Sequence, residues 1–206
     1  MGDVRIEPYT SAMAEEATRM LAEAFATNPL HVAAFGTRQV ANNEAFFRGG
    51  LAAMKGPKRV ALDGSRVVGL VHWVRSPGCR FSTAEKLRMI PAMMRGFGLP
   101  ATLRVASWLG AWSKRHPTDE HGHLGPIGVS PESQGRGVGR RLMDVYCDAL
   151  DRDGIAGYLE TDRPENVRFY GRFGFDVVAE APVLGVPNFY MWREPRAAAP
   201  SPSGAP

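Results

Sequence analysis

The stretch VSPESQGRGVGRRL, residues 129–142, decides the fold more than any other part of the chain. It leaves an apolar strand, turns at Ser-Pro, and enters a predicted helix through alternating glycines at positions 135, 137 and 139. The first N–H groups of a helix have no intrahelical partner, and the helix dipole adds partial positive charge there. Glycines let an anion approach the backbone, and Arg136 and Arg140 add charged donors. The stretch therefore predicts a phosphate-binding loop.

Two common phosphate motifs do not fit this loop. The dinucleotide fingerprint G-x-G-x-x-G fails, because counting from Gly135 its last position is Arg140. A P-loop is excluded because Gly-Lys-Ser/Thr occurs nowhere in the chain. The phosphate must therefore belong to another kind of ligand.

The strand before the loop, Leu124-Gly125-Pro126-Ile127-Gly128-Val129, is unusual for the centre of a sheet. Proline cannot donate to the ladder and glycine has no side chain to pack, so the sequence indicates a bulge or a divergence from the next strand. A diverging strand leaves backbone groups free, and a ligand that carries amides can pair with them. The pantetheine arm of coenzyme A has two amides, and its pyrophosphate would reach the glycine loop. The alternative is that Gly and Pro only mark a turn.

Two motifs now resemble a known family. The segment Gln134–Gly139 resembles the pyrophosphate motif of GNAT acetyltransferases, and Asn166–Phe175 resembles the family's segment that runs from an Asn through a Tyr to Gly-Phe. Residues 124–192 look especially like the branch that includes puromycin N-acetyltransferase. The resemblance is specific to the C-terminal half, since the first 80 residues match only in pattern.

The resemblance implies a mixed sheet of six or seven strands flanked by helices, in one domain over residues 1–194. The Pro, Ala, Ser and Gly composition of residues 195–206 predicts a disordered tail. Acetyl-CoA would bind between the strands 124–129 and 158–161. An amine would then attack the thioester directly, in a ternary complex and without a metal.

The same resemblance implies which residues hold the cofactor. Backbone groups of Ile127 and Val129 would hold the pantetheine, and residues 134–140 the pyrophosphate. Asn166 would orient the cofactor or the strand ends, or would cap the following helix. The predicted cofactor-binding residues are Ile127, Gly128, Val129, Gln134, Gly135, Arg136, Gly137, Val138, Gly139, Arg140 and Asn166.

Tyr170 and His123 are the predicted catalytic residues. Tyr170 would act as the general acid for the departing sulfur; the alternative is a core residue packed beside its phenylalanine neighbours. An attacking amine must be neutral, so a base is expected, and His has a suitable unperturbed pKa of about 6.5. His121 and Glu160 are further candidates for this base.

Residues 83–116 predict two amphipathic helices separated by Gly98-Leu99-Pro100. Leu87, Ile90, Met94 and Phe97 would form the apolar face of the first helix. The pair would either pack on the core or form a homodimer face, or it would cover an acceptor site as a lid. Earlier in the chain, Thr10 or Ser11 is expected to cap a helix that Asn28-Pro29 ends.

Composition sets broader bounds. The 206 residues carry a net charge of +4 with scattered arginines, which favours no nucleic-acid surface. No apolar run is as long as a membrane span, and no signal peptide is evident. The two cysteines, Cys79 and Cys147, are interpreted as reduced thiols. A cytoplasmic protein without a membrane partner is therefore expected. A small-molecule amine is the expected acceptor. The alternatives are a protein or peptide acetyltransferase and an acyl-CoA sensor without turnover.

Overall fold

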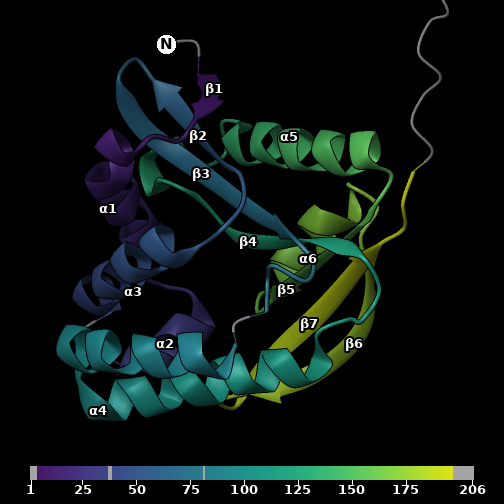
Figure 1. Cartoon of the computed structure of the whole chain (residues 1–206). Coiled ribbons are helices and arrows are strands. Elements are labelled where there is room, and N and C mark those ends of the chain that lie inside the picture. The colour runs from purple at the N-terminus through teal and green to yellow at the C-terminus, as the bar shows by residue number, and fades with distance from the viewer. Residues whose placement is uncertain (1–3, 37–38, 81, 197–206) are drawn as a thin grey trace, which may run out of the picture.

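The computed structural model describes residues 4–36, 39–80 and 82–196, without the side chains of positions 39, 83, 86 and 88. Its centre is a seven-stranded mixed sheet with the order β1-β2-β3-β4-β5-β7-β6, in which β4 and β5 are parallel and the other neighbours antiparallel (Figure 1). The strands are β1 (Arg5–Pro8), β2 (Lys58–Asp63), β3 (Arg66–Arg75), β4 (His121–Val129), β5 (Ala156–Thr161), β6 (Asp176–Val183) and β7 (Val186–Arg193). The predicted mixed sheet with flanking helices is confirmed.

Helices cover both faces of this sheet. They are η1 (Ser11–Met13), α1 (Ala14–Ala24), α2 (Pro29–Phe35), α3 (Gln39–Ala53), α4 (Thr83–Arg115), η3 (Pro131–Ser133), α5 (Val138–Asp153) and α6 (Pro164–Gly171). Successive strand residues point to opposite faces, and the neighbours Val67 and Val68 enter different apolar clusters. Val68 packs with the α5 side chains, whereas Val67 packs with those of α1 and α3. The core therefore lies in two layers, one on each side of β3.

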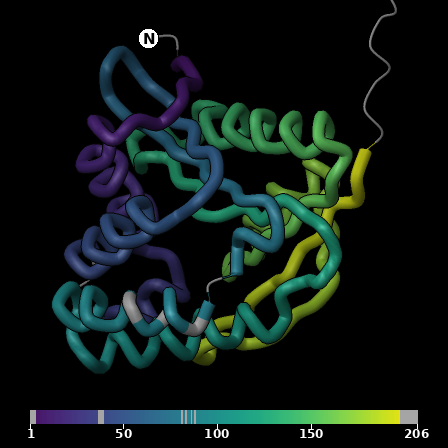
Figure 2. The backbone as a smooth tube through the Cα atoms, viewed as in Figure 1, coloured from purple at the N-terminus to yellow at the C-terminus, as the bar shows by residue number. Residues whose placement is uncertain are grey.

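The predicted helical pair before β4 is confirmed. The segment α4 breaks at Gly98, whose φ of 79° is one that glycine adopts without strain. Figure 2 shows the long path out from β3 and back to β4, and Figure 1 shows both arms of α4 lying across the end of the fold from α3 to β6 and β7. A third apolar cluster, with Val105 and Trp108 at its centre, fastens this layer to α2 and the β6–β7 turn.

The apolar face predicted for the first arm of α4 is partly wrong. Phe97 packs into the third cluster, but Leu87, Ile90 and Met94 are exposed. The buried side of this arm includes Met93 instead of Met94, because only one edge of the arm lies against the rest of the protein.

Two predictions near the N-terminus are also wrong. Neither Thr10 nor Ser11 caps α1, because the 3-10 turn η1 intervenes and Met13 occupies the cap position. Asn28-Pro29 begins a helix instead of ending one: the Asn28 side chain accepts the His31 N–H, and Pro29 fills the first helical position, where no N–H is needed. The helix α2 therefore starts where only the end of a helix was expected.

No helix in the described ranges is long and apolar enough to cross a membrane. The predicted disordered tail falls mostly on residues 197–206, which lie outside the described residues.

Candidate active site

The sheet splits between β4 and β5. Their parallel pairing covers only His121 to His123 on β4, opposite Ala156 to Tyr158 on β5. Beyond His123, β4 stays paired with β3 through a register shift at Val71 to Trp73. The expected bulge and divergence of this strand are therefore confirmed.

Close packing of neighbouring side chains is a second reason why β4 contains glycines. A Cβ on Gly125 would overlap the His72 ring, and one on Gly128 would lie 2.7 Å from Leu21 Cδ2. Both positions therefore require glycine while the rest of the strand stays extended.

The free edge of β4 carries the backbone groups predicted to bind pantetheine. The Ser130 N–H donates to Val68 O on β3. Backbone groups alternate sides along a strand, so those of Ile127 and Val129 point away from β3, toward the split. The Val129 carbonyl accepts a hydrogen bond from Gln134 Nε2 at 3.1 Å on that side.

The glycine loop connects this strand to α5. Gly137 is the N-cap residue in the left-handed conformation, with φ 79°, and no side chain caps the helix. No atom lies within 4 Å of the Cβ position of either Gly135 or Gly137, apart from their chain neighbours. An uncapped helix start beneath an open backbone cradle fits a pyrophosphate.

The Arg136 side chain of the loop, expected to bind the phosphate, is already paired with a carboxylate. Arg136 forms an ion pair with Asp63, with both terminal nitrogens 3.3 Å from Oδ2. The helix α5 starts at Val138, so Gly135 and Gly137 precede it and only Gly139 lies in its first turn, although the sequence predicts a helix entered through all three glycines. The backbone of the loop, more than Arg136, is therefore oriented for an anion.

A cavity of about 410 Å³ opens from the split toward α4. Its wall is mainly aromatic and aliphatic, and it includes side chains of α2, α3 and the second arm of α4. Four predicted site residues also line it: Tyr170, His123, Asn166 and Ile127. The polar side chains that line it include Asn28, His31, Glu160 and Asp162.

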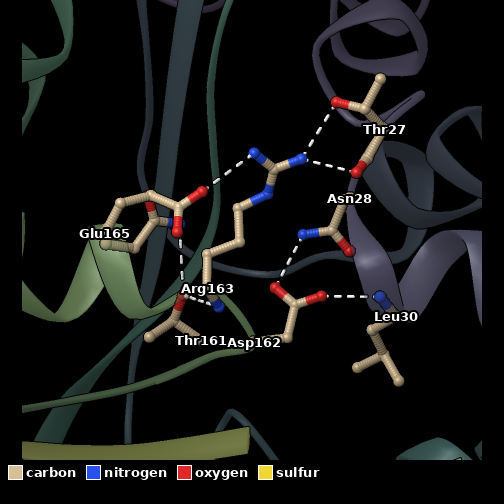
Figure 3. Close-up of polar contacts among 8 residues, drawn as sticks. Thr27, Asn28, Leu30, Thr161, Asp162, Arg163 and Glu165 are labelled. Carbon is tan, nitrogen blue, oxygen red and sulfur yellow. Dashed lines mark hydrogen bonds and ion pairs between the residues drawn. The ribbon is translucent and has the colours of Figure 1, made fainter. Parts of the chain in front are cut away.

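Asp162, at the end of β5, fastens α2 to this wall (Figure 3). Its carboxylate accepts the Leu30 N–H at 2.6 Å and the Asn28 Nδ2 group at 2.8 Å. Beside it, Arg163 reaches the Thr27 carbonyl and hydroxyl. These contacts join the start of α2 to the end of β5.

Removal of this carboxylate should destabilise the fold. We expect Asp162→Ala to lower the free energy of unfolding by about 3 kcal/mol, because two buried donors lose a charged acceptor. Asp148→Ala, on the exposed face of α5, is the matched control and should change it by less than about 0.5 kcal/mol. Urea unfolding measures the free energy of unfolding of both variants, and equal values would contradict the stabilising role of the Asp162 hydrogen bonds.

Tyr170 lies on α6, where its ring packs in the core and also lines the cavity. The ring packs against Phe169 and Phe175, with centroids 5.3 and 6.4 Å away. Burial, with a smaller effect of the Asp162 carboxylate, raises the pKa of Tyr170 above its usual value. The hydroxyl therefore keeps its proton at neutral pH.

Asn166 does not cap α6. The cap position belongs to Arg163, and Asn166 sits inside the helix, donating through Nδ2 to the Thr161 hydroxyl at 3.2 Å. Its contact with the end of β5 matches the expectation that it orients a strand end.

His123 pairs with Glu160 across the start of the split. His123 Nε2 lies 2.7 Å from Glu160 Oε2, and the side chain of Glu160 is only 2% exposed. Burial disfavours a charged His123, but the Glu160 carboxylate and Cys79 outweigh it and raise the pKa of His123. The other oxygen, Glu160 Oε1, is buried and has no hydrogen-bond partner among the described residues.

Sequence reasoning missed Cys79, His116 and Asp162 as site residues. Cys79 Sγ lies 3.9 Å from His121 Nε2, and His116 Nε2 lies 3.3 Å from His123 Nδ1. Burial alone would raise the pKa of the Cys79 thiol, but its contacts with His116, His121 and His123 hold that pKa well below its usual range. The His-x-His pattern at 121–123 was a local signal, whereas nothing near Cys79 pointed to this cluster.

Comparison with known proteins gives a consistent picture. Residues 60–175 match the family model described as the acetyltransferase (GNAT) family. A mycothiol acetyltransferase of Mycobacteroides abscessus is 35% identical over 88 residues, which cover 40% of this chain and 30% of that protein. The L-methionine sulfoximine/L-methionine sulfone acetyltransferase of Salmonella typhimurium is 34% identical over 70 residues, covering 32% of this chain and 40% of that protein. The chain therefore spans less than half the length of either relative.

Solved structures share the whole fold. A Corynebacterium glutamicum structure described as histone acetyltransferase HPA2 and related acetyltransferase superposes with a TM-score of 0.74. It is 24% identical and covers 95% of this chain and 98% of that one. At this identity the likeness supports the fold alone.

Proposed function

Since the chain belongs to the GNAT acetyltransferase family, we propose that it transfers the acetyl group of acetyl-CoA to the amine of a small molecule. The observation that carries the proposal is the free edge of β4, which runs from the glycine loop to the aromatic cavity. Acetyl-CoA supplies the activated thioester when it is bound. A cavity that α4 borders on one side suits a small acceptor better than a peptide chain.

The names of two relatives favour the same acceptor class. The mycothiol acetyltransferase and the methionine sulfoximine/methionine sulfone acetyltransferase are both named for small molecules. Each match covers less than half of this chain, so these names support the class of acceptor and no particular compound.

The residues of the chain divide the chemistry among them. Backbone groups of Ile127 and Val129 hold the pantetheine along β4, and an N–H there polarises the thioester carbonyl. The backbone of residues 134–140 holds the pyrophosphate. Tyr170 keeps a proton that it can share with the departing sulfur.

The His123–Glu160 pair is the proposed base. His123 holds one carboxylate oxygen of Glu160 and both side chains line the cavity, so the pair can take up the proton that the acceptor ammonium must lose. Because the two side chains share one proton site, the pair rather than either residue alone carries this step.

The acceptor class is tested by following release of the CoA thiol with a panel of amines. Small amines with apolar bodies should give the fastest release, because the cavity wall is mostly apolar. Faster reaction with peptide amines would favour a protein acetyltransferase instead. CoA binding without turnover on any amine would favour a sensor.

The cavity wall supplies a further prediction at Trp112, which lines it and donates through Nε1 to Asn188 Oδ1 at 3.0 Å. Trp112→Ala should raise the acceptor KM about tenfold while changing the acetyl-CoA KM by less than about twofold. The exposed Leu103 lies on the same arm of α4, and Leu103→Ala should leave both values unchanged. A change in Tm or oligomeric state alone would favour the core or dimer-face interpretation of α4.

A further inference from the structure

Four potential metal ligands gather at the inner end of the cavity. Cys79 lies between β3 and α4, His116 follows α4 directly, and His121 and His123 begin β4. One ligand atom from each of Cys79, His116 and His121 lies within 4.8 Å of the other two. His123 lies beside this group of three and would have to shift to complete it: its Nδ1 lies 3.3 Å from His116 Nε2, but its ring centroid is 6.3 Å from that of His121.

The outer nitrogen of each imidazole has an acceptor as its partner. His121 Nδ1 lies 2.7 Å from Asp119 O, and His116 Nδ1 lies 3.2 Å from Pro117 O. His123 Nε2 lies 2.7 Å from Glu160 Oε2. Carbonyl and carboxylate oxygens only accept hydrogen bonds, so each of these three ring nitrogens carries its proton.

When the rings are neutral, the inner nitrogens, which are His116 Nε2, His121 Nε2 and His123 Nδ1, therefore each carry a lone pair. His116 Nε2 and His123 Nδ1 then face each other at 3.3 Å, and His121 Nε2 faces Cys79 Sγ at 3.9 Å. Facing lone pairs repel unless a positive centre lies between them. Metal-binding histidines commonly show the same arrangement, with the outer N–H held by a carbonyl or carboxylate.

Two separations in the group, 3.3 Å between His116 Nε2 and His123 Nδ1 and 3.9 Å between Cys79 Sγ and His121 Nε2, are close to those around a tetrahedral ion. Zinc bonds of about 2.0–2.1 Å to nitrogen and 2.3 Å to sulfur place neighbouring ligand atoms about 3.4–3.6 Å apart. One thiolate with three imidazoles is a ligand set of intermediate softness, which favours Zn²⁺ over Mg²⁺ or Ca²⁺. We propose that Cys79, His116, His121 and His123 form a structural zinc site, although no metal was expected from the sequence.

The place of this site gives the ion a structural role. Cys79 precedes α4 and His116 follows it, so one ion would fasten both ends of the α4 excursion to the start of β4 (Figure 1). Four protein ligands leave no open position, as in structural rather than catalytic zinc sites. The His123 Nε2–H bond to Glu160 is retained, so the site is compatible with the proposed base pair.

The test compares Cys79→Ser with Cys147→Ala in the full chain. Cys147 is buried in the core on α5, away from the cluster, and burial raises the pKa of its thiol to about 11. Metal analysis of the purified protein should find about one zinc ion per chain in the wild type and in Cys147→Ala. Competition with a chromophoric chelator should show zinc binding weakened by at least about a hundredfold in Cys79→Ser.

Cobalt provides an independent readout. Added Co²⁺ should produce the visible bands of a tetrahedral site and a near-ultraviolet thiolate charge-transfer band. The charge-transfer band should disappear in Cys79→Ser and weaken in His116→Gln, but it should persist in Cys147→Ala. Circular dichroism of the metal-free variants checks that each one folds.

Equal zinc affinity in Cys79→Ser and the wild type would overturn the proposal. So would a folded wild type that binds neither zinc nor cobalt, since the positive centre would then be a proton shared between the imidazoles. Neither result bears on acetyl transfer, because no readout requires turnover.

Discussion

Tyr170→Phe should lower kcat by roughly tenfold to a thousandfold while the melting temperature and the affinity for acetyl-CoA stay nearly constant. The ring of Tyr170 packs against Phe169 and Phe175, and phenylalanine keeps those contacts. The substitution therefore removes only the hydroxyl that faces the cavity.

The pKa values of the phenol and the thiol explain why the loss of kcat in Tyr170→Phe is limited. A phenol of pKa near 10 is a weaker acid than a thiol near 8.5, so full transfer to a thiolate is uphill by roughly 2 kcal/mol. Burial raises the pKa of Tyr170 further, which increases this cost but guarantees that the hydroxyl carries its proton. A hydrogen bond that strengthens as charge develops on sulfur still stabilises the transition state.

Tyr146→Phe is the matched control. Tyr146 is fully buried, and its hydroxyl donates to Gly122 O within the core at 2.6 Å instead of facing the cavity. This variant should lose about 1 kcal/mol of stability and keep its kcat. Near-normal kcat in Tyr170→Phe, measured where chemistry limits the rate, would remove Tyr170 from the mechanism.

Gly137→Asp should weaken CoA binding by an order of magnitude or more, which calorimetric titration can measure. Gly137 is the N-cap residue of α5, and its open Cβ position lies at the expected pyrophosphate site. An aspartate there adds a negative charge where the ligand is itself negative.

The backbone conformation of Gly137 requires a careful control. Its φ of 79° strains most side chains, so loss of binding in Gly137→Asp alone would not isolate the charge. Gly137→Asn has nearly the same shape and tolerates the left-handed conformation equally well. The charge effect is the difference between the two variants, and equal CoA affinities in folded Asp and Asn variants would contradict the assignment.

The sequence predicted the backbone of the glycine loop and of β4 well because its signals are local. The glycines at 135 and 137 and the Gly-Pro pattern of β4 dictate backbone geometry wherever they occur, and the structure has the loop and the split at these residues. The break of α4 at Gly98 was predictable for the same reason.

The remaining features depend on contacts between distant parts of the chain. Asn28-Pro29 reads equally as a helix stop or a helix start, and the Asp162 carboxylate 134 residues away holds it at the start of α2. Cys79 meets His121 only because α4 leaves and rejoins the sheet at neighbouring points. No local pattern around Cys79 encodes that return.

The measurement that tests the central claim most directly is the location of the acetyl group after a single turnover. Protein and acetyl-CoA are mixed, half of the sample receives the best amine, and intact mass spectrometry of both quenched halves locates the acetyl group. Direct attack predicts unmodified protein in both halves and an acetylated amine only in the second. An acetyl group on the protein before the amine is added, above all on the Cys79 thiol that lines the cavity, would contradict direct transfer.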